Sequence, residues 1–429
     1  MCRTQSPLSS SLVQTMSNTS AAQSSRHIIV PQNCTGCALC ANVCGHNAIR
    51  MEWSKEGFLV PQVNLDACIN CGACVKACPA QPAHLEEWSR GAEDTLPPSP
   101  YGGWHAEKGT HLASSSGGVF SALAEQVFAA GGCVFGVVWE NKDTAKFTKA
   151  ENMEELAAMR GSKYTQAVPG MVYREVKAEL KNGRRVLFCG TSCQVYALKR
   201  YLRKDYENLL LIDILCHGVP SRNLLQSYIR EMESTAGKEL ARIQFRDKAG
   251  NWQRYQVTKI FSDGSTLSHV NREDMFMHIF IGDFVLNKAC YSCPHARFPR
   301  VGDITLGDFW GDLQKLHPDW PIRDGIGSIL GNTLKGKAIL EELSATEAAA
   351  LIPDALDNLI GGQRSTYLRH NANIPVNRER VLQALKEEKL SNIHHTLFDF
   401  VSCGPFRVRK NSFLHKVYML LRANKKKIT

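Results

Sequence analysis

Two copies of one cysteine pattern, C-x2-C-x2-C-x3-C, stand near the start of the chain. The first copy runs from Cys34 to Cys44 and the second from Cys68 to Cys78, which Pro79 follows. At this spacing one short loop presents three thiolates to a [4Fe–4S] cluster, while the fourth cysteine reaches the cluster of the other copy. In the first copy, Gly45 occupies the position that corresponds to Pro79. This difference leaves all four cysteine ligands in place.

We therefore predict two [4Fe–4S] clusters that exchange their fourth ligands. The first cluster is expected to take Cys34, Cys37, Cys40 and Cys78, and the second Cys68, Cys71, Cys74 and Cys44. A pair of zinc sites or a disulfide knot is the alternative. Eight cysteines in two identical frames, the second ending in Cys-Pro, favour iron over both.

A hairpin is predicted between the two copies, with strands at 48–53 and 58–63 around a turn that ends at Gly57. After Cys78 the chain becomes rich in proline and in small polar residues, which is the composition of a linker. We therefore expect an α+β ferredoxin-type module with two clusters over 27–82, followed by a linker over 83–102.

The region after the linker alternates helices with apolar strands. A helix is predicted over 119–130, and buried strands over 132–138, 185–189 and 209–215. Helices between apolar strands are typical of a parallel sheet that is covered on both faces. A hairpin whose first strand is 255–261 adds antiparallel structure. We expect an α/β domain over 103–340 with a mainly parallel sheet and an added antiparallel hairpin.

The chain has 429 residues, 44% of them hydrophobic, and a formal net charge of +10. Fourteen Lys or Arg and four Asp or Glu fall in 364–429, so the whole positive excess lies in this tail. We expect a helical, basic C-terminal region over 341–429. Its last helix either packs on the domain with a solvated basic end or lies peripherally on a membrane surface. Its charge is expected to steer an acidic electron carrier such as ferredoxin.

Cluster thiolates require a reducing compartment, so a cytoplasmic protein is expected. The sequence has no run of 18 apolar residues, so no membrane span is predicted, and no nucleic-acid partner is predicted either. Residues 1–26 are rich in Ser, Thr and Gln and lack both acidic residues and an apolar core, which predicts a disordered leader and not a secretory signal. An organellar transit peptide and a start at Met16 are the alternatives.

Five further motifs lie in the expected α/β domain. They are SSGG at 115–118, GSKY at 161–164, GTSCQ at 190–194, CHGVPS at 216–221 and GDITLGDFW at 302–310. Joined to the cysteine module, they resemble the coenzyme F420 hydrogenase/dehydrogenase beta-subunit family over roughly residues 103–336. The resemblance implies an iron–sulfur flavoprotein with FAD as its cofactor, and it indicates the electron chemistry better than the substrate.

A candidate flavin site begins with Ser115, Ser116, Gly117 and Gly118, which open the helix predicted over 119–130. Backbone N–H groups, hydroxyls and the positive end of a helix dipole suit a pyrophosphate, although an ordinary capped helix start is the alternative. No G-x-G-x-x-G follows a strand, so a Rossmann-type site is not predicted.

The remaining flavin candidates come from the motif that contains Ser162, Lys163 and Tyr164. Lys163 is a candidate charge against flavin N1/C2 or the phosphate, and Tyr164 is a candidate stacking ring. On the sequence alone, each is equally compatible with an exposed loop.

A third [4Fe–4S] cluster is predicted beside the flavin. Its ligands would be Cys193, Cys216, Cys290 and Cys293. Cys193 and Cys216 each follow an apolar strand, so in a parallel sheet both lie at the carboxyl edge where such sheets bind ligands. Zinc is the alternative, since four thiolates suit it equally well. The resemblance and the need for a cluster near the flavin favour iron. Cys133, Cys189 and Cys403 are expected to be small apolar core residues.

Two functions follow from these predictions. The first is an FAD-dependent and iron–sulfur-dependent oxidoreductase that passes electrons between a carrier, the clusters and an organic substrate; the carrier is reduced ferredoxin or the deazaflavin coenzyme F420. A flavin is needed because clusters move single electrons while a hydride carries two. The second is an electron-transfer subunit that relays electrons to a separate catalytic partner. No catalytic residue and no substrate can be named from the sequence.

Overall fold

The computed structural model describes residues 27–81, 84, 96–362, 374–394 and 397. The expected leader, most of the expected linker and the basic end of the chain, including Cys403, lie outside the described residues. Within the described part, no helix is long and apolar enough to cross a membrane.

The cysteine module folds as two short helices and one hairpin, of which the hairpin was predicted. It contains α1 (Leu39–Val43), β1 (Ile49–Trp53), β2 (Leu59–Val63) and α2 (Ala73–Ala77). β1 and β2 pair antiparallel, with Ile49 opposite Val63. Each helix starts after a small residue in the left-handed region, Ala38 at φ 59° and Gly72 at φ 74°. The two cysteine copies therefore use the same local geometry.

The large domain is built on a nine-stranded sheet with the order β14-β3-β13-β12-β8-β7-β4-β5-β6. Its strands are β3 (Ser99–His105), β4 (Cys133–Trp139), β5 (Ala145–Ala150), β6 (Ala167–Val168), β7 (Val186–Thr191), β8 (Leu209–Ile214), β12 (Ile304–Asp308), β13 (Gly327–Gly331) and β14 (Ala349–Pro353). β12, β8, β7 and β4 form a parallel block at the centre. The prediction of a mainly parallel sheet was wrong, because β3, β13 and β14 pair antiparallel on one side of this block and β5 pairs antiparallel with β4.

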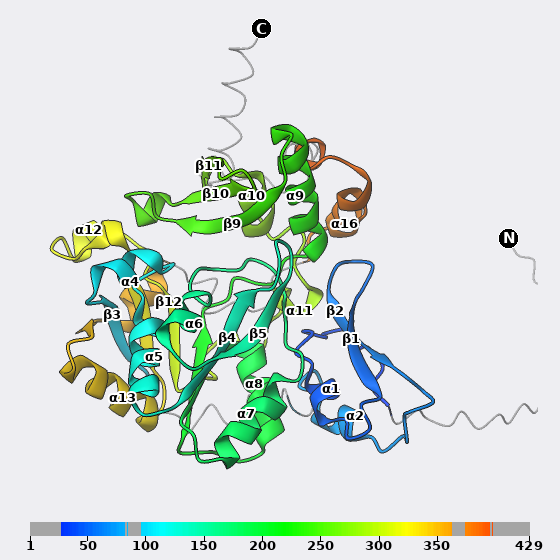
Figure 1. The fold of residues 1–429 in the computed structure, drawn as a ribbon, viewed down its shortest axis with the longest axis horizontal. Helices are drawn as coiled ribbons and strands as arrows, with labels where there is room; N and C mark the ends of the chain where they lie inside the picture. The colour runs from blue at the N-terminus through cyan, green and yellow to red at the C-terminus, as the bar shows by residue number, and fades with distance from the viewer. Residues whose placement is uncertain (1–26, 82–83, 85–95, 363–373, 395–396, 398–429) are drawn as a thin grey trace, which may run out of the picture.

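Helices cover both faces of the sheet (Figure 1). They are α5 (Val119–Ala129), α6 (Met153–Ala157) and α13 (Leu334–Ala345) on one face, and α7 (Val172–Lys181) and α8 (Ser192–Leu202) on the other. The apolar runs of β7 and β8 are buried because they meet a helical layer on each side. Leu39 and Ala77 of the module join the core that α7 and α8 form, so the module is packed against this face.

A second sheet of three antiparallel strands has its own core and lies above the large sheet in Figure 1. It consists of β9 (Leu240–Asp247), β10 (Gln256–Phe261) and β11 (Thr266–Val270), and it packs with α9 (Arg222–Ala236), α10 (Met275–Ile281) and α16 (Arg378–Glu387). The hairpin predicted at 255–261 is therefore present as β10 and β11. β9 had not been predicted as a separate strand.

The remaining short elements connect these layers. They are α4 (Lys108–Ala113), η1 (Trp252–Arg254), α11 (Lys288–Tyr291), α12 (Leu313–Leu316), η2 (Ile322–Asp324) and α14 (Leu356–Gly361). Two expected boundaries differ from the structure. β3 begins inside the expected linker, and β14 lies beyond residue 340 yet pairs with β3, so the large sheet needs chain from both sides of the expected domain.

Candidate functional site

The fourth thiol of the second cysteine copy lies with the first three thiols of the first copy. Burial raises the pKa of Cys34 to about 11, and the neighbouring Cys78 thiol raises it further. Burial likewise raises the pKa of Cys40 to about 12, with the thiols of Cys34 and Cys78 as further causes. Cys37 has the same neighbours. These four thiols are the set predicted for the first cluster.

The other module thiols form a more open group. Burial raises the pKa of Cys74, and the Cys68 thiol adds to this shift. Cys44 packs in one apolar cluster with Cys74, and Cys40 and Cys78 belong to the same cluster, so the two cysteine copies lie side by side. Backbone N–H groups donate to both sulfurs, from Ile28 to Cys74 at 3.2 Å and from Ala48 to Cys44 at 3.3 Å. Cys71 is exposed.

Both groups fit iron–sulfur clusters. Ionised thiols packed this closely repel one another in a buried site, and the positive charge of bound metal removes that repulsion. N–H donors aimed at ligand sulfurs are among the groups that set the potential of such clusters. In the described residues no disulfide joins the cysteines, and no group of three or more His, Cys, Asp or Glu side chains is arranged to hold one metal ion.

A third group of thiols gathers where the central strands of the large sheet end. Cys193 stands at the start of α8, directly after β7, Cys216 follows β8, and Cys290 lies on α11. Burial raises the pKa of Cys290 well above its ordinary value, and the thiols of Cys216, Cys293 and Cys193 raise it further. The fold thus brings together the four cysteines predicted as ligands of a third cluster.

A buried ion pair supports this third group. Asp213 and Arg300 are 0% and 2% exposed, and the guanidinium of Arg300 contacts Asp213 Oδ2. Ser192 Oγ, next to Cys193 in the chain, donates to the same oxygen at 2.7 Å. Arg300 Nη1 also donates to the carbonyl of His295 at 2.9 Å, in the loop that follows Cys293. The pair therefore ties the segments that carry the thiols to the end of β8.

The first and third thiol groups are neighbours. The Cys37 thiol is among the groups that raise the pKa of Cys193, after burial and the Cys293 thiol. The buried ring of Tyr173 lies near both, and its hydroxyl donates to the carbonyl of Cys37 at 2.8 Å. A short path therefore leads from the module to the end of the large sheet.

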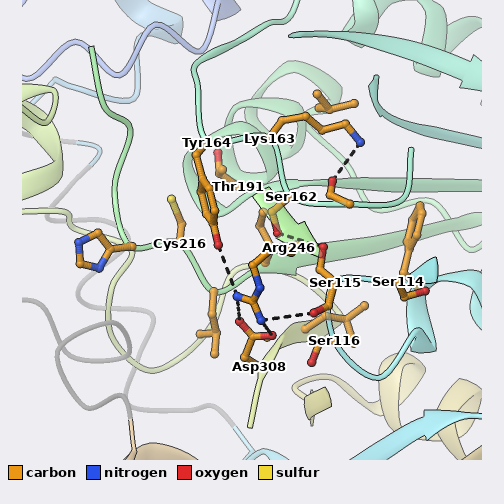
Figure 2. Close-up of a pocket in the computed structure, with 18 of the residues that line it drawn as sticks. Ser114, Ser115, Ser116, Ser162, Lys163, Tyr164, Thr191, Cys216, Arg246 and Asp308 are labelled. Atoms are coloured by element: carbon orange, nitrogen blue, oxygen red, sulfur yellow. Dashed lines mark hydrogen bonds and ion pairs between the residues drawn. The ribbon is translucent and has the colours of Figure 1, made fainter. Parts of the chain in front are cut away.

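A cavity of about 960 Å³ opens beside the third thiol group. It is lined by all seven candidate flavin residues, which are Ser115, Ser116, Gly117, Gly118, Ser162, Lys163 and Tyr164. Cys193 and Cys216 line the same cavity, together with residues of the three-stranded sheet such as Arg246 and Tyr255. Figure 2 shows Ser115, Ser162 and Tyr164 gathered around Arg246, with Cys216 beside them. Cys189 also lines this cavity, whereas Cys133 is buried as predicted.

The serine and glycine turn is shaped by the sheet beneath it. Gly118 is the N-cap of α5 at φ 88°, and no side chain caps this helix. Ser115 Oγ accepts a hydrogen bond from Ser162 Oγ at 3.0 Å. A side chain at Gly117 would meet the carbonyl of Gly103 and the amide of Gly327, so this glycine allows close packing on β3 and β13. The backbone has a positive φ at Gly118 but not at Gly117, so it is close packing that requires a glycine at position 117.

Lys163 is engaged with the backbone. Its Nζ donates to the carbonyls of Met159 and Arg160 at 2.8 Å each, and to those of Ala158 and Gly161. Burial lowers its pKa to about 7. Figure 2 shows its side chain pointing away from Tyr164. The ammonium therefore caps the turn after α6, which differs from the expected contact with a flavin.

Two basic side chains, Arg246 of β9 and Lys248 just after it, contact the turn formed by residues 115–118, which we call the serine turn. Neither residue was predicted from the sequence. Arg246 makes a two-point ion pair with Asp308, at 2.8 and 3.1 Å, and also donates to the carbonyl of Ser115 at 3.3 Å. Lys248 Nζ donates to the carbonyl of Ser116 at 2.7 Å, and burial lowers its pKa to about 7. Their spacing of two residues at the end of β9 was the available signal, but their partners lie on other elements.

Tyr164 packs in an aromatic group. Its ring centroid lies 5.4 Å from that of Phe245 and 5.0 Å from that of Phe280, and its hydroxyl is 3.4 Å from Arg246. The ring forms part of the cavity wall. A planar aromatic ligand in the cavity would find apolar contact on this side and hydrogen-bonding groups at the serine turn.

Three family models match the chain. One is described as coenzyme F420 hydrogenase/dehydrogenase, beta subunit N-term, and matches residues 101–172. The second is the C terminus of the same beta subunit and matches 183–354. The third is a 4Fe-4S dicluster domain and matches 33–81. The two beta-subunit models together cover more than half of the chain.

Curated relatives match short stretches of the chain. The chain is 49% identical over 43 residues to the ferredoxin-type protein NapF of Haemophilus influenzae, and 45% identical over 56 residues to the polyferredoxin-like subunit of aliphatic sulfonate oxidoreductase from Pyrococcus furiosus. These matches cover 10% and 13% of this chain, and it spans only 24% and 31% of the two relatives. An uncharacterised protein of Porphyra purpurea is 33% identical in a 70-residue alignment that covers 14% of this chain and 84% of that protein.

Among solved structures, a chain of the F420-reducing [NiFe] hydrogenase complex from Methanosarcina barkeri aligns with a TM-score of 0.43 and 15% identity. The alignment covers 72% of this chain and 94% of that chain.

Proposed function

Because the chain belongs to the coenzyme F420 hydrogenase/dehydrogenase beta-subunit family and carries a 4Fe-4S dicluster domain, we propose that it is an iron–sulfur flavoprotein oxidoreductase. In this proposal electrons pass between an external carrier, three [4Fe–4S] clusters and FAD, and an organic substrate is reduced or oxidised at the cavity. Reduced ferredoxin or the deazaflavin coenzyme F420 is the carrier.

The cavity carries this proposal, because it combines the candidate flavin residues with two thiols of the third group. The amino end of α5 and the hydroxyls of Ser115 and Ser116 suit the pyrophosphate of FAD. Tyr164 and Phe280 supply an apolar wall that would keep water from the ring system of bound FAD. FAD, when bound, supplies the conversion between single electrons and a hydride.

The positions of the thiol groups support an order for the proposed relay. Cys37 of the first group lies beside Cys193 of the third group, and Cys193 lines the cavity. The second group contains the exposed Cys71 and so lies nearest to solvent. The proposed path therefore runs from the second cluster through the first and third to the cavity.

A second candidate function is an electron-transfer subunit without substrate chemistry of its own. The family description favours it, since the matched models describe a beta subunit. In that case the chain delivers electrons to a catalytic partner that approaches the cavity. The isolated chain would then bind FAD and accept electrons, but would convert no small molecule unless the partner was added.

Anaerobic purification with flavin and metal analysis tests the cofactor content. We expect one FAD and about twelve iron per chain, four for each of three clusters. Eight iron and one zinc would contradict the third cluster, and absence of FAD after anaerobic reconstitution would contradict the flavin. Flavin bleaching by reduced ferredoxin, reduced coenzyme F420 and NAD(P)H then identifies the donor. Conversion of a substrate by the isolated chain distinguishes the two candidate functions.

A further inference from the structure

Arg160 brings a basic side chain to the wall of the cavity, beside the first turn of α5. We propose that its guanidinium binds the phosphate groups of FAD, a role for which the sequence had suggested Lys163. This inference rests on the proposed function and names the residue that holds the anionic part of the cofactor.

The guanidinium of Arg160 has no acidic partner among the described residues. Its Nε donates to Ser121 Oγ at 3.1 Å, while Nη1 and Nη2 make no hydrogen bond or ion pair within the described part of the chain. The residue is partly buried. A cation that is partly removed from water is stabilised by an anion, and two free Nη groups can bind a phosphate at two points.

Two neighbouring cations of the cavity wall are already engaged. Arg246 pairs with both carboxylate oxygens of Asp308, at 2.8 and 3.1 Å. Lys163 Nζ donates to four backbone carbonyls. An anion that enters the cavity near the serine turn therefore meets in Arg160 a cation for which no carboxylate competes.

Backbone amides of α5 lie beside this guanidinium. Ser121, which accepts from Arg160, is the third residue of α5, and no side chain caps the helix. The first two residues, Val119 and Phe120, also line the cavity. Their N–H groups have no carbonyl partner within the helix, because they precede its first full turn. The helix and Arg160 thus offer hydrogen-bond donors to one anion from two separate elements.

Lys163 shapes the turn that carries Arg160. Its Nζ donates to the carbonyl of Arg160 at 2.8 Å, which fixes the backbone there. Two side-chain hydrogen bonds then join this segment to the start of α5, from Arg160 to Ser121 and from Ser162 to Ser115. The two basic residues of the segment therefore have different tasks: Lys163 holds the backbone, and Arg160 presents its charge to the cavity.

Three ligands separate a phosphate contact from a structural role. The test compares the binding of FAD, riboflavin and ADP to the flavin-free full chain with its clusters in place, by anaerobic titration calorimetry. Riboflavin has the ring system without phosphate, whereas ADP has the pyrophosphate without the ring system. Arg160→Met should weaken the binding of FAD and ADP about tenfold or more and leave that of riboflavin unchanged, because only the phosphates lose a charged hydrogen bond.

Two further variants complete the comparison. Arg160→Lys keeps the charge without the planar fork and should recover part of the affinity for FAD. Arg323→Met is the matched control: Arg323 also makes one hydrogen bond through Nε, to the carbonyl of Gly250 at 3.2 Å, and is not among the residues that line this cavity. Its three affinities should equal those of the unchanged chain. The unfolding midpoint of the flavin-free protein should be the same in all four proteins.

The possible outcomes distinguish this inference from the flavin proposal. Equal FAD affinity in Arg160→Met and the unchanged chain would overturn the inference. An equal loss of affinity for FAD and riboflavin would also overturn it, since that result indicates a structural role. Arg160-dependent binding of ADP without any binding of FAD would support the phosphate site and contradict the flavin. Failure of the unchanged chain to bind either FAD or ADP would contradict both.

Discussion

The cysteine module and the third thiol group bring similar sets of predicted ligands together in different ways. In the module, Cys34, Cys37 and Cys40 lie within seven consecutive residues, and only the fourth thiol comes from farther along the chain. The third group takes Cys193 and Cys216 from the ends of two strands and its other thiols from the loop at α11. The first arrangement depends on local loop geometry, whereas the second depends on the whole large sheet.

The supporting contacts differ in the same way. Module sulfurs accept hydrogen bonds from nearby backbone amides, such as that of Ala48 to Cys44. The third group depends on the Asp213–Arg300 pair, which joins residues 87 positions apart in sequence. A substitution distant in sequence should therefore damage the proposed third cluster while leaving the proposed module clusters intact. Four experiments test parts of this comparison.

The largest effect is expected for Asp213→Ala. It leaves Arg300 buried without its carboxylate, which costs about 3–5 kcal/mol of folding free energy, and it frees the loop after Cys293. We expect loss of about four of twelve iron atoms per chain with the module EPR signals retained. Iron analysis, EPR and thermal unfolding measure this. Asp143→Ala is the control, since its pair with Arg222 is partly exposed and lies elsewhere; full iron in Asp213→Ala would remove the supporting role.

Cys78→Ser and Cys44→Ser test the exchanged ligands within the module. Because Cys78 lies with Cys34 and Cys40, its loss should damage the first cluster and spare the second. Cys44→Ser should damage the second cluster instead. EPR at graded potentials measures each cluster in the two variants. The opposite pattern would show that each copy supplies all four ligands of its own cluster.

Gly117→Val tests whether a glycine is needed at this position for packing against the sheet or for the approach of the FAD phosphate. The new side chain would meet backbone atoms of Gly103 and Gly327, so we expect the large domain to lose about 1–3 kcal/mol of stability. FAD should then be lost in proportion to unfolding, and the module clusters should persist. Gly361→Ala is the control, because nothing lies within 4 Å of its added Cβ. Selective FAD loss at unchanged stability would instead indicate that the phosphate approaches Gly117 itself.

The last experiment concerns Lys163. Burial lowers its pKa to about 7, below the value near 10.4 expected in the unfolded chain. Between these values the unfolded chain holds a proton that the folded chain releases, so Lys163 makes stability increase from pH 7 to pH 10. In Lys163→Met, the rise of denaturant midpoint over this range should be smaller. An equal rise in both proteins would show that the four carbonyls keep the folded ammonium protonated.

Local patterns predicted the local parts of this molecule. The hairpin at 49–63 and the buried strands β7 and β8 followed from turn residues and apolar runs, and the gathering of the third thiols followed from the rule for strand ends. The antiparallel side of the large sheet was missed, because β3 pairs with strands that follow it by more than two hundred residues. Arg246 and Lys248 were missed for the same reason: their partners Asp308 and Ser116 are distant in sequence.

The position of β3 also bears on the order of folding. This strand directly precedes the rest of the large domain, yet both of its neighbours, β13 and β14, are synthesised near the end of that domain. The large sheet is therefore complete only after residue 353 has been synthesised. Pairing of strands over such a sequence separation is slow. The module has local contacts and precedes this event, so it can fold and receive its clusters while the sheet is still open. During synthesis, the proposed electron path is thus completed from its solvent end inward.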